Sequence, residues 1–267
     1  MVRQVYHSLV DNIELLVGKR DKLTPPRRLV EGIGGGNFNQ IGDEFFRYFL
    51  EVGHLHPDHS VLDVGCGCGR MAVPLTRFLS DKGGYWGFDI VEESIAWCQK
   101  NIGERHRNFH FLLADVYNKT YHPRGRFCAA EYRFPYLDDF FDFVSLTSVF
   151  THMLARDMQN YLSQIARVLK PGGRCLISYF LLNDESRDCL RRGLGTVKFP
   201  FVDDNCLISS RKHPEGAVGF DEQFIRDNFA VCGLEILDPI RYGNWCGRKL
   251  LYSYQDIVFA TKPDRRN

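Results

Sequence analysis

Hydrophobic positions follow two different periods along this chain, and their alternation predicts an α/β fold. From Leu154 to Leu169 apolar residues recur every three or four positions, which predicts a helix with one buried face that ends at Pro171. Short apolar runs rich in β-branched and aromatic residues predict buried strands around such segments. These strands are predicted at 61–64, 85–90, 109–113, 141–148 and 174–180.

Residues 1–56 have another pattern and are predicted to form a helical extension ahead of the main domain. A weak amphipathic pattern predicts a helix over 1–20, which Pro25-Pro26 ends. Four glycines predict a loop over 31–40, and helical spacing resumes at 41–50. The loop is either a flexible connector or a flap near a bound cofactor, because it enters the fold just before the first strand.

Composition and charge narrow the class of protein. The chain has 267 residues, of which 44% are hydrophobic, and this suits one α/β domain with additions. Its formal net charge is +1, so nucleic acid is not favoured as a partner. Nine cysteines occur without a C-x-x-C pair, so we expect no metal site and a reducing compartment. No apolar run resembles a signal peptide or a membrane span, so we expect a cytoplasmic protein without membrane contact, and a homodimer is compatible with the sequence.

The stretch from Val61 to Arg70 contains the strongest functional signal. A short buried strand ends in three glycines at alternate positions, Gly65, Gly67 and Gly69, and a helical pattern follows. Glycine is required where a ligand approaches the backbone or where a tight turn needs a positive φ. A dinucleotide fingerprint would need glycine in place of Arg70, and the Gly-Lys-Ser/Thr of a P-loop is absent. A glycine turn that binds nothing is the alternative interpretation.

Two acidic residues follow at the ends of the next two predicted strands. Asp89 lies roughly 20–30 residues past the glycines, as a ribose-binding acid requires, since a carboxylate offers two acceptors to two vicinal hydroxyls. A helix N-terminal charge ahead of Glu92-Glu93 is its alternative role. Asp115 follows the third strand, where an acid either ends a turn or binds a ligand.

Together these segments resemble the class I S-adenosylmethionine (SAM)-dependent methyltransferases, in particular the bacterial-type group that acts on small molecules. The segments Phe141–Val144 and Arg167–Gly173 complete the resemblance in the expected order. It implies a Rossmann-like seven-stranded, mostly parallel sheet with helices on both faces and one antiparallel strand near the edge. It also implies that 233–241 and 254–261 are the last two strands, and that SAM is the cofactor and S-adenosylhomocysteine (SAH) the product. The implied cofactor-binding residues are Asp63, Gly65, Cys66, Gly67, Gly69, Arg70, Asp89, Ile90, Asp115, Val116 and Thr147.

Within the main domain, 57–267, residues 183–219 exceed the usual length of a connection and are predicted to be an insertion that serves as a substrate cap. Alternating residues over 196–201 and 206–208 predict a hairpin within it. An oligomer contact or a surface decoration is the alternative role.

Methyl transfer from SAM is a direct displacement, so the protein mainly positions the reactants and excludes water, and a base helps if the acceptor is a hydroxyl. His152 follows the fourth strand and is the candidate base, although a histidine at a helix entrance often only orders the loop. Tyr179 is a lesser catalytic candidate. We predict transfer to an O or N atom of a small-molecule acceptor. Two alternatives are a methyltransferase for RNA or protein and a SAM-binding protein without catalysis.

Overall fold

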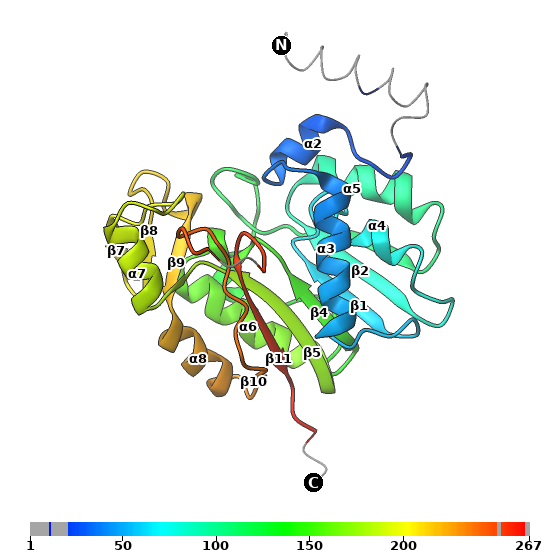
Figure 1. The fold of residues 1–267 in the computed structure, drawn as a ribbon. Coiled ribbons are helices and arrows are strands. Elements are labelled where there is room, and N and C mark those ends of the chain that lie inside the picture. Colours follow the sequence, from blue (N-terminus) through cyan, green and yellow to red (C-terminus); the bar gives the residue numbers. More distant parts are fainter. Residues whose placement is uncertain (1–10, 12–20, 250–251, 265–267) are drawn as a thin grey trace. The chain divides into compact units, whose positions relative to one another are not determined.

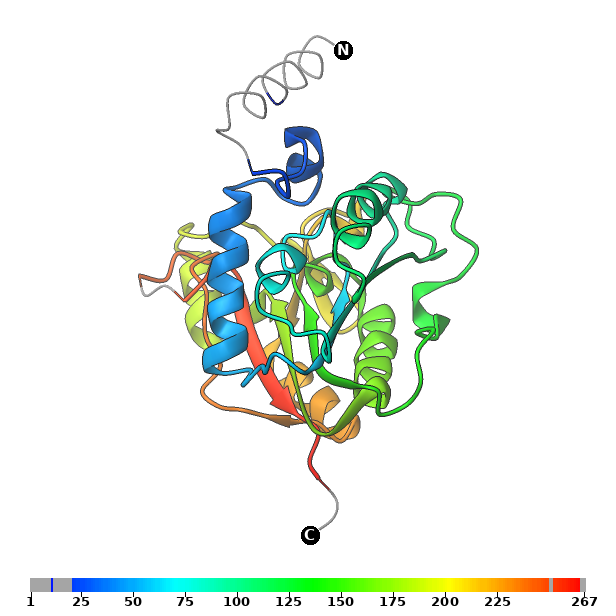
Figure 2. The same cartoon turned by 90° about the vertical axis from the view of Figure 1, so that its right-hand side faces the viewer.

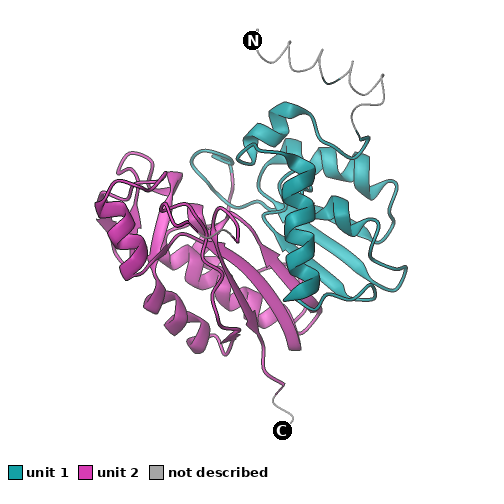
Figure 3. Ribbon diagram, in the orientation of Figure 1, with its two compact units in different colours: residues 1–124 teal, residues 125–267 magenta. Residues whose placement is uncertain are grey.

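The computed structural model describes residues 11, 21–249 and 252–264, so the helix predicted over 1–20 lies outside the described residues apart from Asp11. The chain forms two compact units, residues 1–124 and 125–267 (Figure 3). In the described part of the chain, no helix is long and apolar enough to cross a membrane.

Three parallel strands form the centre of the first unit. Strand β1 (Ser60–Val64) pairs with β2 (Gly84–Asp89), which pairs with β3 (Phe109–Leu113). Helix α3 (Phe38–Glu51), the long blue helix in Figures 1 and 2, packs on α4 (Ala72–Leu75). Helix α5 (Glu92–Cys98), which a π-helical turn η1 (Gln99–Gly103) extends, contacts β2 and β3.

The first unit confirms the predicted strands and changes two helix boundaries. Helix α2 (Arg27–Gly32) begins directly after Pro26, so the glycine-rich loop is limited to 33–37. Helix α4 is one turn long, although the apolar pattern extends to Leu79. The Thr76 hydroxyl donates to the carbonyl of Val73 at 2.7 Å, and such local bonds compete with the helical ladder.

Strands of both directions build the second unit. Strand β4 (Phe141–Leu146) pairs in parallel with β5 (Leu169–Tyr179), and β11 (Asp256–Thr261) pairs antiparallel with β5 and with β10 (Glu235–Ile236). Helix α6 (Ala155–Val168) contacts β5 and α8 (Glu222–Val231). Two short 3-10 turns, η2 (Ala129–Glu131) and η3 (Phe150–His152), complete this part.

The seven strands named so far form one sheet in the order β10-β11-β5-β4-β1-β2-β3. Its parallel pairs and the reversed strand β11 near one edge confirm the predicted Rossmann-like architecture.

The predicted insertion at 183–219 has its own secondary structure. It contains α7 (Asp184–Arg191), the strands β7 (Phe201–Asp203) and β8 (Cys206–Ile208), and the 3-10 turn η4 (Pro214–Gly216). With β6 (Leu181–Leu182) and β9 (Val218–Asp221), these strands form a second sheet in the order β6-β9-β8-β7. The predicted hairpin is confirmed, but its first strand begins at Phe201. The sequence analysis missed α7, which a capping box of Asn183 and Ser186 begins.

Candidate active site

The glycine turn after β1 has the conformation that the sequence predicts. Gly65, Gly67 and Gly69 have φ values of 74°, 52° and 81°, a region that residues with a Cβ atom rarely adopt. The N–H groups of Gly65 and Cys66 both donate to the carbonyl of Phe88 at the end of β2, at 2.9 and 3.0 Å. The turn is therefore held against β2 by its backbone, and three of its residues offer no side chain to obstruct a ligand.

The Asp89 carboxylate is fixed by backbone donors on both of its oxygens. Oδ2 accepts from the N–H of Gly67 and Oδ1 from the N–H of Val91, both at 2.8 Å. Burial raises the pKa of Asp89 above its ordinary value, while these backbone hydrogen bonds act in the opposite direction. Each carboxylate oxygen has a further acceptor position, so the group has the capacity for two vicinal hydroxyls.

Asp115 and Ile90 lie beside a histidine that the sequence analysis did not select. The Nδ1 atom of His122 lies 2.8 Å from the carbonyl oxygen of Ile90, and its Nε2 lies 3.5 Å from Oδ1 of Asp115. Val116, another predicted cofactor residue, is 3% exposed, so its side chain belongs to the core. No motif marks His122, because its position results from the turn at 118–122.

Arg70 lies next to the glycine-rich loop at 33–37. Its guanidinium donates to the carbonyl of Gly35 at 2.6 Å and lies 5.7 Å from the ring centre of Phe38. The buried Nε has no hydrogen-bond partner among the described residues, and burial lowers the pKa of the guanidinium. A Cβ at Gly67 would lie 2.7 Å from a methyl of Ile33 in the same loop. The loop thus lies against the glycine turn, as a flap would, although its movement stays a prediction.

Two predicted cofactor residues lie beneath the turn. Asp63 is fully buried and accepts a hydrogen bond from the hydroxyl of Tyr85 at 2.6 Å. The Cys66 thiol is also buried, and burial raises its pKa well above the ordinary value, so it stays protonated. Its sulfur and that of Cys98 lie 3.8 and 3.6 Å from the carbonyl of Gly67. In this geometry Asp63 and Cys66 support the turn by their side chains.

In the second unit, a polar network surrounds the end of β4. Thr147 is half-buried, and Ser148 has a φ of 60°, a strained value for serine. The Ser148 N–H donates to the Ser178 hydroxyl at 2.7 Å, and the Gln255 amide donates to the Ser148 hydroxyl at 2.9 Å. The Ser178 hydroxyl in turn donates to Gln255 at 2.6 Å. Strained residues held by their surroundings are frequent at functional sites, which makes this network a candidate functional feature of the second unit.

His152 lies in η3, a few residues past Ser148, and its ring is oriented by the insertion. Its Nδ1 is 2.9 Å from the carbonyl oxygen of Glu215 in η4. A carbonyl oxygen only accepts, so Nδ1 carries the proton and, in the neutral ring, Nε2 has a lone pair. This is the arrangement of a general base that a third group orients.

Tyr179 has a different environment from the one a catalytic base needs. The side chain is fully buried against Phe150 and Phe220, with ring centres 5.4 and 6.4 Å away. Its hydroxyl has no hydrogen-bond partner among the described residues. Burial raises the pKa of the phenol well above its ordinary value, so it is protonated at neutral pH. This geometry argues against the predicted catalytic role as a base.

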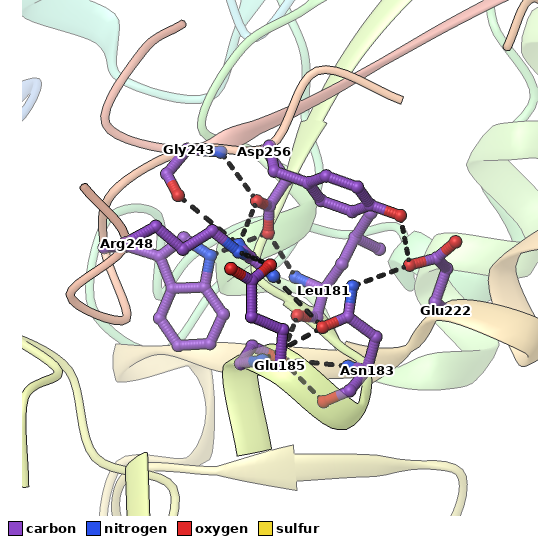
Figure 4. Close-up of polar contacts among 10 residues, drawn as sticks. Leu181, Asn183, Glu185, Glu222, Gly243, Arg248 and Asp256 are labelled. Atoms are coloured by element: carbon purple, nitrogen blue, oxygen red, sulfur yellow. Dashed lines mark hydrogen bonds and ion pairs between the residues drawn. The ribbon is translucent and has the colours of Figure 1, made fainter. Parts of the chain in front are cut away.

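A buried ionic network, shown in Figure 4, anchors the insertion to the rest of the second unit. Asp256 at the start of β11 is fully buried and accepts from the N–H of Leu181 at 2.7 Å and from Arg248 at 2.9 Å. The same guanidinium donates to Glu185 of α7 at 2.8 Å and to Asn183 at 3.1 Å. Burial raises the pKa of Asp256 to about 6, so it is ionised at neutral pH. No group of three potential metal ligands occurs among the residues that the structure describes.

The geometry and a family comparison agree on the class of protein. The turn, the acid after β2 and the sheet order are those of a class I SAM-dependent methyltransferase. A family profile described as methyltransferase domain matches residues 1–211, and the chain belongs to this family. The recognition made from the sequence is therefore confirmed.

The chain matches about half the length of two curated methyltransferases. The chain is 27% identical over 134 residues to the ubiquinone/menaquinone biosynthesis C-methyltransferase UbiE of Vibrio campbellii, covering 50% of this chain and 46% of that protein. It is 30% identical over 178 residues to the methyltransferase GfsG of Streptomyces halstedii, covering 66% of this chain and 54% of that protein. The chain thus spans about half the length of the curated relatives that it matches.

Solved structures show the same fold at low sequence identity. A protein of Pyrococcus horikoshii aligns with a TM-score of 0.59 and 14% identity, over 86% of this chain and 93% of that chain. A SAM-dependent methyltransferase of Methanosarcina mazei aligns with a TM-score of 0.54 and 21% identity, over 78% and 94%.

Proposed function

We propose that this protein transfers the methyl group of SAM to an O or N atom of a small-molecule acceptor. The observation that carries the cofactor half of the proposal is the Asp89 carboxylate, which two backbone N–H groups fix beside a turn of positive-φ glycines. The residues fit a nucleoside cofactor, because Asp89 retains acceptor capacity beside a turn whose three glycines carry no side chain. The buried Arg70 guanidinium, with its unsatisfied Nε, suits a carboxylate such as that of the cofactor's methionine part.

When bound, SAM supplies an activated methyl group on a sulfonium, so the protein need not generate an electrophile. Asp89 accepts from the ribose hydroxyls, and Asp115 accepts from the 6-amino group of the adenine. His152, whose Nδ1–H is bound to the carbonyl of Glu215, takes a proton from the acceptor at Nε2. The insertion at 183–219 supplies this carbonyl, which supports its assignment as a substrate cap.

C-methylation is a second candidate, favoured by the name of the relative UbiE. It requires a base too, because a carbon acceptor must lose a proton. One relative is named a tRNA N(3)-cytidine methyltransferase and is 28% identical over 120 residues. The net charge of +1 gives no support to an RNA substrate here.

The test is transfer of a labelled methyl group from SAM to panels of phenols, amines and activated carbon acids. We expect transfer to a hydroxyl or amine, and His152→Ala should lower turnover by roughly 10²–10⁴-fold with SAH affinity unchanged. His110→Ala is the matched control, since His110 is exposed on β3 and belongs to no part of the candidate site. If only carbon acids, or only RNA, were labelled, the proposed O or N acceptor would be wrong and the labelled class would take its place. If the protein binds SAH but transfers no label to any acceptor in the panels or in a cell extract, the result would support the non-catalytic alternative.

A further inference from the structure

A tight turn brings His122 back to the ends of β2 and β3. The backbone N–H of His122 donates to the carbonyl of Asn118 at 3.0 Å, and the Asn118 N–H donates back at 3.1 Å. The Asn118 side chain accepts from the N–H groups of Thr120 and Tyr121, both at 2.9 Å. The turn is thus closed by its own main chain, and it fixes the place of the imidazole independently of any ligand.

Both atoms that face the imidazole are acceptors. The carbonyl of Ile90 lies 2.8 Å from Nδ1, and a carboxylate oxygen of Asp115 lies 3.5 Å from Nε2. Each of them requires an N–H on the ring nitrogen that faces it, because a lone pair there would be directed at an acceptor. The His122 side chain is 18% exposed and that of Asp115 is 32% exposed, so the carboxylate is accessible to a ligand while its partner is largely covered.

We propose that His122 is a positioning residue for adenine recognition: its Nε2–H holds the carboxylate of Asp115 in the orientation that accepts from the 6-amino group of the cofactor. This inference rests on the proposed use of SAM. A carboxylate held in this way favours a 6-amino purine and repels a 6-oxo purine, which presents an acceptor at the same place. Without the Nε2 contact, Asp115 loses the orientation that this ion pair gives it, and the discrimination is reduced.

The experiment measures the binding of SAH and of S-inosyl-L-homocysteine, its 6-oxo analogue, by calorimetry. The wild-type protein should prefer SAH by roughly tenfold or more, the effect of one hydrogen bond to a charged group. His122→Asn places an amide near Nδ1 and keeps the contact with Ile90, whereas His122→Gln places an amide near Nε2 and reaches Asp115. We expect His122→Gln to keep the preference and His122→Asn to lose most of it, as Asp115→Ala should.

The ratio of the two affinities separates positioning from a purely structural role, which would weaken both ligands equally. Melting temperatures confirm that each variant is folded. His122→Asn remains informative if His122→Ala does not fold. A wild-type ratio in His122→Asn, or equal losses for both ligands in all variants, would overturn the inference. A wild-type protein that binds neither ligand would instead refute the proposed function on which it rests.

Discussion

Replacement of Asp89 by alanine tests the cofactor site most directly. Each Asp89 oxygen accepts one backbone N–H at 2.8 Å and has one acceptor position left for a ribose hydroxyl. A hydrogen bond to a charged group contributes about 1.5–3 kcal/mol. Asp89→Ala should therefore weaken SAH binding by roughly 10- to 150-fold for each of the two ribose hydrogen bonds that is lost, measured by calorimetry at 25 °C.

The same substitution leaves the N–H groups of Gly67 and Val91 without their acceptor, at about 1–3 kcal/mol for each group that stays buried and unpaired. Asp221→Ala is the matched control, because Asp221 accepts from the N–H groups of Gln223 and Phe224 at 2.9 and 3.3 Å, outside the glycine turn. It should lower the melting temperature and leave SAH affinity unchanged. Equal SAH affinity in wild type and in folded Asp89→Ala would refute the assignment of Asp89.

Three further predictions concern the turn, the buried ion pair and pH. Gly67→Ala requires alanine at a φ of 52° and brings its methyl within 2.7 Å of a neighbouring side chain. Gly172 has a φ of 77° but open space around it, so the melting temperature of Gly67→Ala should be lower than that of Gly172→Ala. Equal melting temperatures would contradict this. Asp256→Ala removes the buried carboxylate beside Arg248, which keeps only the exposed Glu185 as an acidic partner, and should lower the free energy of unfolding by about 3–5 kcal/mol in urea titrations. An unchanged midpoint would contradict the role of the pair. SAH affinity should fall as the pH falls through the raised pKa of Asp89, because a protonated carboxyl accepts less well. Calorimetry that shows no loss of affinity over the whole acidic range in which the protein stays folded would exclude an ionised Asp89 as the ribose acceptor.

Local pattern predicted most of the fold because the helices bury one face each and the central strands β1 and β2 are buried on both faces. The runs at β1, β2 and β3 are apolar where their side chains are buried, and the glycines of the turn occupy positions that only glycine adopts without strain. The place of Asp89 at the end of β2, beside the turn, was predictable as well, whereas its role toward a ribose stays a prediction.

The features that the sequence did not predict depend on contacts between residues that are far apart in the chain. Gln255 reaches Ser148 across 107 positions, and His152 reaches Glu215 across 63. No periodicity encodes such pairs, and the turn that positions His122 has no motif of its own. Hydrophobic spacing does not mark helix α7, because only Ser186 and Cys189 of its eight residues are buried; its one local signal is the capping box of Asn183 and Ser186 at its start.

The contact between His152 and the insertion has a consequence for how related enzymes diverge. The oxygen that orients the imidazole belongs to the main chain of Glu215, so it is present whichever amino acid occupies that position. Substitutions at 215 can accumulate without disturbing the ring, and an alignment column there would look unconstrained. A gained or lost residue between β8 and β9 would move the carbonyl itself. Acceptor choice among homologues should therefore follow the length of this loop more closely than its composition.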